Sequence, residues 1–268
     1  MSQPEPQAGL SVTSAEVVLT EVTDGVGTIT LNRPEQMNAI TVELGARLHL
    51  ALIETAARAK VIVIRGSGGN FCAGGDFHEL QRLRAEGRDA MAPLFANFRS
   101  ACDAIAELSV PVICAVEGYA TAGGFELAQA ADIVLVHENA VLADIHSRYG
   151  QVPGGGSTQR LPRLVGRQRA LAHILTGDRL TAEDAVAWGL AYRKYPVAEF
   201  DSGVRAFAEQ LSTKDPVALS RSKRLVNEGL GLSLTEGLSL EFETVLDHLV
   251  SSSAGDGIGS FTTGGRDD

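Results

Sequence analysis

The chain has 268 residues, 44% of them hydrophobic, and its 33 acidic side chains against 23 basic ones give a formal net charge of −10. This length and composition are typical of a globular protein that buries a sizeable core as one large domain or as a domain with an appendage. The acidic balance argues against nucleic acid as a partner, because phosphates require a basic surface, whereas a small anionic ligand needs only local donors.

The sequence predicts a cytoplasmic protein that does not interact with a membrane. No apolar run reaches the roughly 18 residues that a membrane helix needs, and the first segment, MSQPEPQAGLSVTSAE, has neither a basic leader nor an apolar signal core. Cys72, Cys102 and Cys114 match no metal-ligand or redox spacing. We therefore expect packed, reduced cysteines, no disulfide framework and no metal site.

The N-terminal part of the chain predicts a hairpin followed by a helix. Two β-rich runs, 15–22 and 25–32, flank a TDG turn, which is the pattern of two antiparallel strands. Thr41 is a candidate helix N-cap, and three leucines recur after it at helical spacing. The next apolar run then begins near residue 60.

Three further apolar runs predict buried strands, at 60–66, 110–118 and 131–138. Each follows a helical stretch, which favours parallel crossover connections in an α/β core. After Pro153 the patterns are mainly helical. We expect an α/β core over residues 1–195, a helical C-terminal region over 196–250 and a Gly/Ser-rich tail over 251–268.

Two segments share the plan of a strand, a glycine-containing loop and a helix. They cover residues 61–80 and 112–132. Each loop offers backbone N–H groups at a helix N-terminus, where free donors and the helix dipole favour negative charge. If the loops converge, they form an oxyanion hole. Taken alone, each loop is also explained by the steric needs of a strand–helix junction, and neither reads as a dinucleotide, P-loop or serine-hydrolase motif.

Glu126 lies in the second turn of a helix otherwise made of small and apolar residues, between two apolar strands. We expect it to be buried, where an ionised carboxylate is costly without a purpose. The alternative is a surface glutamate or a charge that complements the start of the helix.

Four stretches in order carry a family resemblance: LNRPEQMNAI (31–40), FCAGGDFHEL (71–80), EGYATAGGFELAQAADIVL (117–135) and VPGGGSTQRLPRLVG (152–166). With them, the chain resembles the enoyl-CoA hydratase/isomerase (crotonase) superfamily from the N-terminal hairpin to about residue 250. The resemblance implies an α/β spiral of ββα units with a helical C-terminal trimerisation region, assembled as a homotrimer or homohexamer. It also implies an acyl-CoA thioester substrate, with coenzyme A entering as part of the substrate and no separate cofactor.

Position by position, the resemblance assigns roles to several residues. It implies the Gly75 and Gly123 amides as oxyanion donors and Glu126 as the first catalytic carboxylate. It further implies that the loop around Ala39, with Ala73 and Gly75, holds the bent pantetheine and adenine of CoA through backbone contacts, with Arg33 as a candidate for a CoA phosphate.

The sequence departs from the family pattern in three places. An alignment without gaps on PGGGSTQRL puts His146 where hydratases carry a second glutamate. His78 occupies a position that is often lysine, and the end of the chain, 259–268, lacks the basic residues that often reach a neighbour's CoA phosphates. The first departure concerns the reaction, and the other two concern CoA affinity.

His146 has two interpretations. Histidine titrates near neutral pH and can replace the glutamate in either proton transfer of hydration. Alternatively, it shapes the pocket of an enzyme that uses Glu126 alone. Asp144, two residues earlier, shares a face with His146 if the segment is extended, and is a second candidate acid or base.

Three functions follow from these residues. The first is a lyase of fatty acid metabolism, an enoyl-CoA hydratase that uses Glu126 and His146 around an oxyanion-stabilised enolate. The second is another crotonase-type reaction: enoyl-CoA isomerisation, or hydrolysis of a thioester or a C–C bond. The third is an acyl-CoA-binding protein without efficient catalysis. Turnover of crotonyl-CoA would favour the first, and tight binding without turnover the third.

Overall fold

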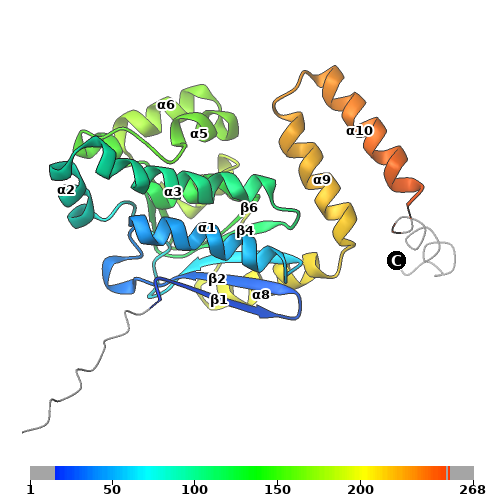
Figure 1. Ribbon diagram of the computed structural model, residues 1–268, viewed down its shortest axis with the longest axis horizontal. Helices are drawn as coiled ribbons and strands as arrows, with labels where there is room; N and C mark the ends of the chain where they lie inside the picture. The colour runs from blue at the N-terminus through cyan, green and yellow to red at the C-terminus, as the bar shows by residue number, and fades with distance from the viewer. Residues whose placement is uncertain (1–15, 252, 254–268) are drawn as a thin grey trace, which may run out of the picture.

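The computed structural model describes residues 16–251 and 253 (Figure 1). Its central feature is a six-stranded sheet in the order β1-β2-β3-β4-β6-β9. β1 and β2 pair antiparallel, and every later neighbouring pair is parallel. The strands are β1 (Val18–Thr23), β2 (Val26–Leu31), β3 (Val61–Gly66), β4 (Val112–Val116), β6 (Ile133–His137) and β9 (Arg193–Tyr195). The predicted hairpin and parallel crossovers are therefore confirmed.

Helices cover both faces of this sheet. Alternate strand residues such as Ile62 and Ile64 share a core with α1 (Val42–Ala56) and α3 (Arg88–Glu107) on one face. The intervening residues, such as Val61 and Val63, pack against α8 (Phe200–Ser212) on the other. This alternation follows from the two-residue period of a strand. Within the C-terminal region predicted for 196–250, α8 thus packs on the sheet.

Three short strands form a second, smaller sheet. Two of its strands end next to the site: β5 leads into the helix that contains Glu126, and β7 leads into the segment that contains His146. The order of this sheet is β5-β7-β8, with β5 parallel to β7 and β7 antiparallel to β8. These strands are β5 (Tyr119–Thr121), β7 (Val141–Ala143) and β8 (Leu180–Thr181). The surrounding helices are α2 (Phe77–Glu86), α4 (Gly123–Ala130), α5 (Ser157–Val165), α6 (Arg167–Thr176) and α7 (Ala182–Ala187), with 3₁₀ turns η1 (Pro34–Gln36), η2 (His146–Tyr149) and η3 (Val197–Glu199).

The last two helices, α9 (Pro216–Gly229) and α10 (Leu234–Leu249), form a hairpin that extends away from the sheet (Figure 1). Lys223 of α9 connects it to the core through an ion pair with Asp132 at 2.7 Å. Many large apolar side chains of the hairpin are exposed, including Leu230 at 78% and Phe242 at 58%. Of the tail predicted for 251–268, only residues 251 and 253 are described, so its sequence features, including the departure at 259–268, lie outside the described residues.

Candidate active site

Three loops meet at the N-terminus of α4. The first glycine loop joins the second through backbone hydrogen bonds from Cys72 N to Tyr119 O (2.9 Å) and from Thr121 N to Cys72 O (3.0 Å). Ile40, in the loop that precedes α1, donates its N–H to the carbonyl oxygen of Gly74 at 2.7 Å. The two glycine segments that the sequence singles out therefore converge.

The backbone at this junction adopts conformations that only certain residues tolerate. Ala122, immediately before α4, has φ 48° and ψ −117°, which costs of order 1–3 kcal/mol for a non-glycine residue. Gly124 lies so close to the first loop that a Cβ there would meet the Cys72 carbonyl oxygen at 2.0 Å. Such strain is maintained by the surrounding packing and is often found at functional sites.

The amides of Gly75 and Gly123 are available to a ligand. Both residues line the same cavity, and neither N–H donates a hydrogen bond to another group in the part of the chain that the structure describes. The loops are in direct contact, because the Thr121 hydroxyl donates a hydrogen bond to the carbonyl oxygen of Ala73 at 2.9 Å. This arrangement suits two donors to one developing oxyanion.

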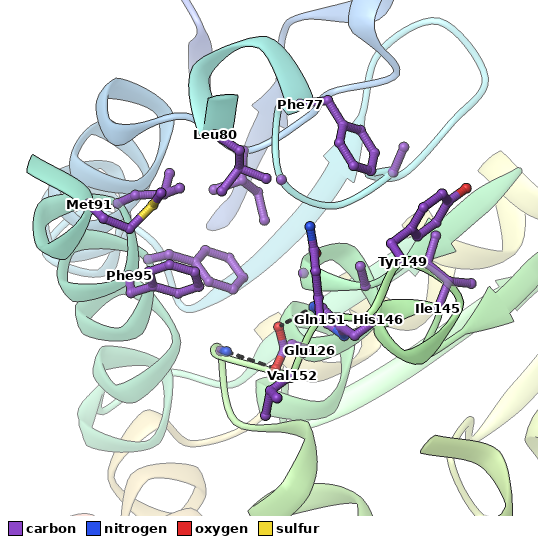
Figure 2. A pocket seen from close by; sticks show the side chains of 18 residues that line it. Phe77, Leu80, Met91, Phe95, Glu126, Ile145, His146, Tyr149, Gln151 and Val152 are labelled. Atoms are coloured by element: carbon purple, nitrogen blue, oxygen red, sulfur yellow. Dashed lines mark hydrogen bonds and ion pairs between the residues drawn. The ribbon is translucent and has the colours of Figure 1, made fainter. Parts of the chain in front are cut away.

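Glu126 is 2% exposed, as expected, and its two carboxylate oxygens have different surroundings. Oε1 accepts hydrogen bonds from the amides of Gly155 (2.7 Å) and Ser157 (3.1 Å). Oε2 faces His146 (Figure 2). Burial raises the pKa of the Glu126 carboxyl, although the Ser157 amide, the His146 charge and the Gly155 amide oppose that shift. The carboxyl is thus held in place and can carry a proton nearer neutrality than an exposed glutamate.

Asp144 and His146 form a hydrogen-bonded pair. His146 Nδ1 lies 2.7 Å from Asp144 Oδ1, and Asp144 is fully buried. Burial alone would lower the pKa of His146, but the hydrogen bond to Asp144 and the charges of Asp144 and Glu126 together outweigh burial and raise that pKa. Burial alone would raise the pKa of Asp144, but the contacts with His146 and Ser157 and the His146 charge together outweigh it and lower that pKa, so Asp144 stays ionised. The carboxylate therefore places a proton on Nδ1 and leaves Nε2 facing Glu126.

The gap between His146 and Glu126 has the size for a bridging water. Nε2 of His146 lies 3.9 Å from Oε2 of Glu126, which is too long for a direct hydrogen bond. A water at about 2.8 Å from both atoms would hydrogen-bond to each.

A second histidine, His173, contacts the backbone of this pair. His173, on α6, is 2% exposed, and its Nε2 accepts the backbone N–H of Asp144 at 3.1 Å. Burial lowers the pKa of His173, which keeps the ring neutral and able to accept this bond. Sequence analysis did not single out His173, because a lone histidine in an amphipathic helix gives no local signal of its contact.

Of the remaining residues predicted to bind CoA, one lines the cavity and two do not. Ala73 lines the cavity, whereas Arg33 and Ala39 lie outside its lining. The Arg33 guanidinium donates to the carbonyl oxygen of Ala39 and pairs with Asp76 at 2.8 Å. Asp76 in turn caps α2 by accepting the amides of residues 78 and 79. Arg33 thus braces the first glycine loop, and the CoA contacts of Arg33 and Ala39 stay predictions.

The cavity beside Glu126 measures about 320 Å³ and is mainly apolar. Sequence analysis missed most of its walls, which come from α2, α3 and η2. Within the described residues, no three His, Cys, Asp or Glu side chains are grouped as they would be to hold a metal ion. Across the same residues, none of the helices is long and apolar enough to span a membrane.

Comparison with known proteins identifies the family of the chain. Residues 21–263 match the family model described as enoyl-CoA hydratase/isomerase. The chain belongs to this family. It is 34% identical over 238 residues to the mitochondrial enoyl-CoA hydratase of Pongo abelii, a match that covers 88% of this chain and 80% of that protein.

Solved structures give the same result for the fold. The chain matches an enoyl-CoA hydratase from Polaromonas sp. JS666 with a TM-score of 0.88 and 32% identity, covering 91% of this chain and 96% of the other. A Bacillus anthracis enoyl-CoA hydratase matches with a TM-score of 0.86 and 30% identity, covering 92% and 96%. The predicted crotonase-type α/β fold is therefore confirmed, and the protein is a crotonase-type enzyme.

Proposed function

We propose that the protein adds water across the double bond of a 2-enoyl-CoA thioester, with His146 in place of the usual second glutamate. The observation that supports this most directly is the 3.9 Å gap between His146 Nε2 and Glu126 Oε2, beside the free amides of Gly75 and Gly123. Two proton-transfer groups, one water position and one oxyanion hole are what hydration needs.

In this mechanism, the thioester oxygen accepts hydrogen bonds from the Gly75 and Gly123 amides. His146 Nε2 removes a proton from the bridging water as the water oxygen bonds to Cβ, and the electron pair of the double bond moves toward the thioester oxygen as an enolate. Glu126 then donates its proton to Cα, and the enolate collapses. The imidazolium is stabilised by the Asp144 carboxylate.

The two groups suit these roles because their pKa values are shifted in useful directions. The raised pKa of Glu126 favours a carboxyl that can donate a proton, and the Asp144 hydrogen bond makes His146 a stronger base. After one turnover the proton has moved from Glu126 to His146. A water in the gap can return it, because it would lie within hydrogen-bond distance of both groups.

The Asp144–His146 pair also favours a second candidate, hydrolysis. The same imidazole could direct the water at the thioester carbonyl or at a carbonyl two carbons away, and the oxyanion hole would stabilise the tetrahedral intermediate. Hydrolysis releases free CoA thiol or cleaves a C–C bond, whereas hydration does neither.

The test is a product assay on a panel of thioesters. We expect crotonyl-CoA or a longer 2-enoyl-CoA to be converted to the 3-hydroxyacyl-CoA, with one solvent deuterium incorporated at Cα in D₂O and no thiol released. Thiol release would replace this proposal with hydrolysis, and conversion of a 3-enoyl-CoA to the 2-enoyl-CoA without hydration would replace it with isomerisation. Binding without turnover of any of these thioesters would leave an acyl-CoA-binding protein.

We also propose that the enzyme works in fatty acid metabolism in the cytoplasm as a homotrimer or homohexamer, with CoA supplied by the substrate and no other cofactor. The free cysteines Cys72, Cys102 and Cys114 suit a reducing compartment. Exposed apolar side chains on α9 and α10, such as Phe242, suit burial by another copy. Light scattering at micromolar concentration should give the mass of three or six chains, and a monomer would contradict this assembly.

A further inference from the structure

The cavity above Glu126 extends far beyond the reacting atoms. Glu126 and His146 lie at its floor, with Leu80, Met91 and Phe95 on one side and Phe77 and Tyr149 on the other (Figure 2). The Phe77 and Tyr149 rings meet edge to face, with centroids 5.4 Å apart. A substrate whose thioester reaches the two glycine amides therefore places its acyl group among aliphatic and aromatic side chains.

The polarity of the cavity disfavours a charged acyl group. Among its described lining residues, the ionisable side chains are Glu126, His146 and Tyr149, and no lysine, arginine or aspartate lines it. A carboxylate at the far end of the acyl group would meet no lysine or arginine there to offset the hydration that it gives up against the apolar walls.

The volume exceeds the needs of a four-carbon acyl group. At roughly 30 Å³ for each water-sized group, about 320 Å³ holds about ten such groups. The reacting water and the thioester oxygen use two of these places. The remainder corresponds to an acyl group of about eight carbons.

The wall formed by α3 depends on two glycines of the loop after η2. A Cβ on Gly154 would lie 2.5 Å from Phe95 Cε1, and a Cβ on Gly155 would lie 2.5 Å from Phe98 Cε1 and 2.8 Å from Glu126 Oε2. The absence of side chains at these positions lets Phe95 pack against Gly154 and brings Phe98 close to the Glu126 carboxylate at Gly155. The same two glycines therefore position both the apolar wall of α3 and the loop that holds Glu126.

We propose that the preferred substrate carries an uncharged, apolar acyl group of about eight carbons, either a straight chain or a chain with a phenyl ring. This proposal rests on the proposed function for the position of the thioester. The wall residues Met91, Phe95 and Leu80 select the acyl group, and the edge-to-face rings of Phe77 and Tyr149 flank it on the opposite side.

The direct test measures affinity with saturated thioesters, which cannot be hydrated. Calorimetric titration would compare butyryl-CoA, octanoyl-CoA, 3-phenylpropionyl-CoA and glutaryl-CoA. Each buried methylene strengthens binding about fourfold, so octanoyl-CoA should bind about 10²-fold more tightly than butyryl-CoA. Glutaryl-CoA should bind no more tightly than butyryl-CoA. Equal affinities for butyryl-CoA and octanoyl-CoA, or tight binding of glutaryl-CoA, would overturn the proposal.

The comparison of octanoyl-CoA with 3-phenylpropionyl-CoA identifies the shape of the preferred acyl group. Tighter binding of octanoyl-CoA than of 3-phenylpropionyl-CoA assigns a straight chain, and the reverse order assigns a ring. Either order supports the apolar class, provided that the tighter of the two binds more tightly than butyryl-CoA.

A filling variant tests the location of the acyl group. Met91→Trp should reduce the affinity ratio of octanoyl-CoA to butyryl-CoA by at least about tenfold, because the larger side chain occupies the cavity. Ala96→Trp is the matched control, since it adds the same side chain at an exposed position of the same helix that does not line the cavity. An unchanged ratio in folded Met91→Trp would place the acyl group elsewhere.

The same thioesters separate failure of this proposal from failure of the proposed function. If octanoyl-CoA binds tightly but 2-octenoyl-CoA is not hydrated, the assigned reaction is wrong and the acyl class stands. If 2-enoyl-CoA thioesters are hydrated but affinity does not depend on chain length, the reaction stands and the acyl class is wrong.

Discussion

At the scale of single residues, the site contains two carboxylates, Glu126 and Asp144, whose pKa values are shifted in opposite directions. Glu126 and Asp144 are both buried, and burial acts to raise the pKa of each, but only Glu126 ends with a raised pKa. The contacts of Asp144 with His146, at 2.7 Å, and with Ser157 together outweigh burial and lower its pKa, whereas Glu126 lies 3.9 Å from the same histidine ring. In the proposed mechanism, Asp144 orients the imidazole and Glu126 exchanges protons with the substrate.

The pH dependence of kcat/KM tests His146. The proposed mechanism needs a neutral His146 and a protonated Glu126, so kcat/KM should fall at low pH, where His146 gains a proton, and at high pH, where Glu126 loses its proton. The Asp144 contact raises the pKa of His146 above the usual value near 6.5. His146→Ala should abolish the limb that depends on His146 and slow turnover by about 10²–10⁴-fold. His146→Glu should move the limb toward the carboxylate range. An unchanged pH profile in folded His146→Ala would show that His146 shapes the pocket without transferring a proton.

Asp144→Asn provides a matched variant for the same experiment. The amide removes the charge that raises the pKa of His146, so the limb of the pH profile that depends on His146 should shift to lower pH while the side chain keeps nearly the same shape. A limb that stays in place would mean that it reports a group other than His146.

Glu126→Gln tests the proposed acid. The glutamine oxygen can still accept the amides of Gly155 and Ser157, so the fold of the loop should persist. Because glutamine has no proton to donate, kcat on the best 2-enoyl-CoA should fall by at least about 10²-fold, while the affinity for a saturated acyl-CoA changes little. Near wild-type turnover would assign Glu126 a structural role.

At the scale of elements, the site depends on the loop that leads into α4. Gly123→Pro removes one oxyanion donor at the first position of a helix, where proline is tolerated. We expect a 10²–10³-fold loss of kcat. A Cβ at this position also meets Ile40 Cδ1 at 2.5 Å. Gly123→Ala is therefore the control, since it adds the Cβ but keeps the N–H, and it should lose much less activity. Equal losses in the two variants would attribute the effect to crowding.

Local signals explain which elements could be predicted from the sequence. Thr41 accepts the amide of Leu44, as the N-cap pattern predicts, and Asp24 and Gly25 supply the two positive φ angles that a tight hairpin turn requires. The glycine loops and buried Glu126 were also predicted, because small residues beside an isolated carboxylate are visible in the sequence. Each of these features depends on neighbours within a few positions.

Features that depend on distant contacts could not be predicted. Ala122 adopts φ 48° although alanine does not favour it, because the tertiary packing around α4 imposes that conformation. His173 meets Asp144 across 29 positions, and the edge-to-face pair of Phe77 and Tyr149 joins two segments far apart in the chain. The cavity beside Glu126 belongs to this group, since its walls come from separate helices.

At the scale of the whole molecule, one buried lysine joins the C-terminal hairpin to the catalytic core. Lys223 Nζ contacts three acceptors: Asp132 Oδ2 (2.7 Å), Ile105 O (2.6 Å) and Val110 O (2.9 Å). Its three N–H donors are thus fully used. Burial lowers the pKa of Lys223 and raises that of Asp132, and the charge of each residue opposes the shift of the other.

Lys223→Met should detach the hairpin of α9 and α10 more than it disturbs the sheet. Methionine leaves the Asp132 carboxylate, whose side chain is only 16% exposed, without its cation, which destabilises the contact between the hairpin and the core. We expect faster amide hydrogen exchange in α9 and protease cleavage between α8 and α9, with smaller changes in α1 and α3. Lys214→Met, at an exposed position before α9, is the control and should behave as wild type. Unchanged exchange in α9 of Lys223→Met would mean that apolar packing, and not this ion pair, holds the hairpin in place.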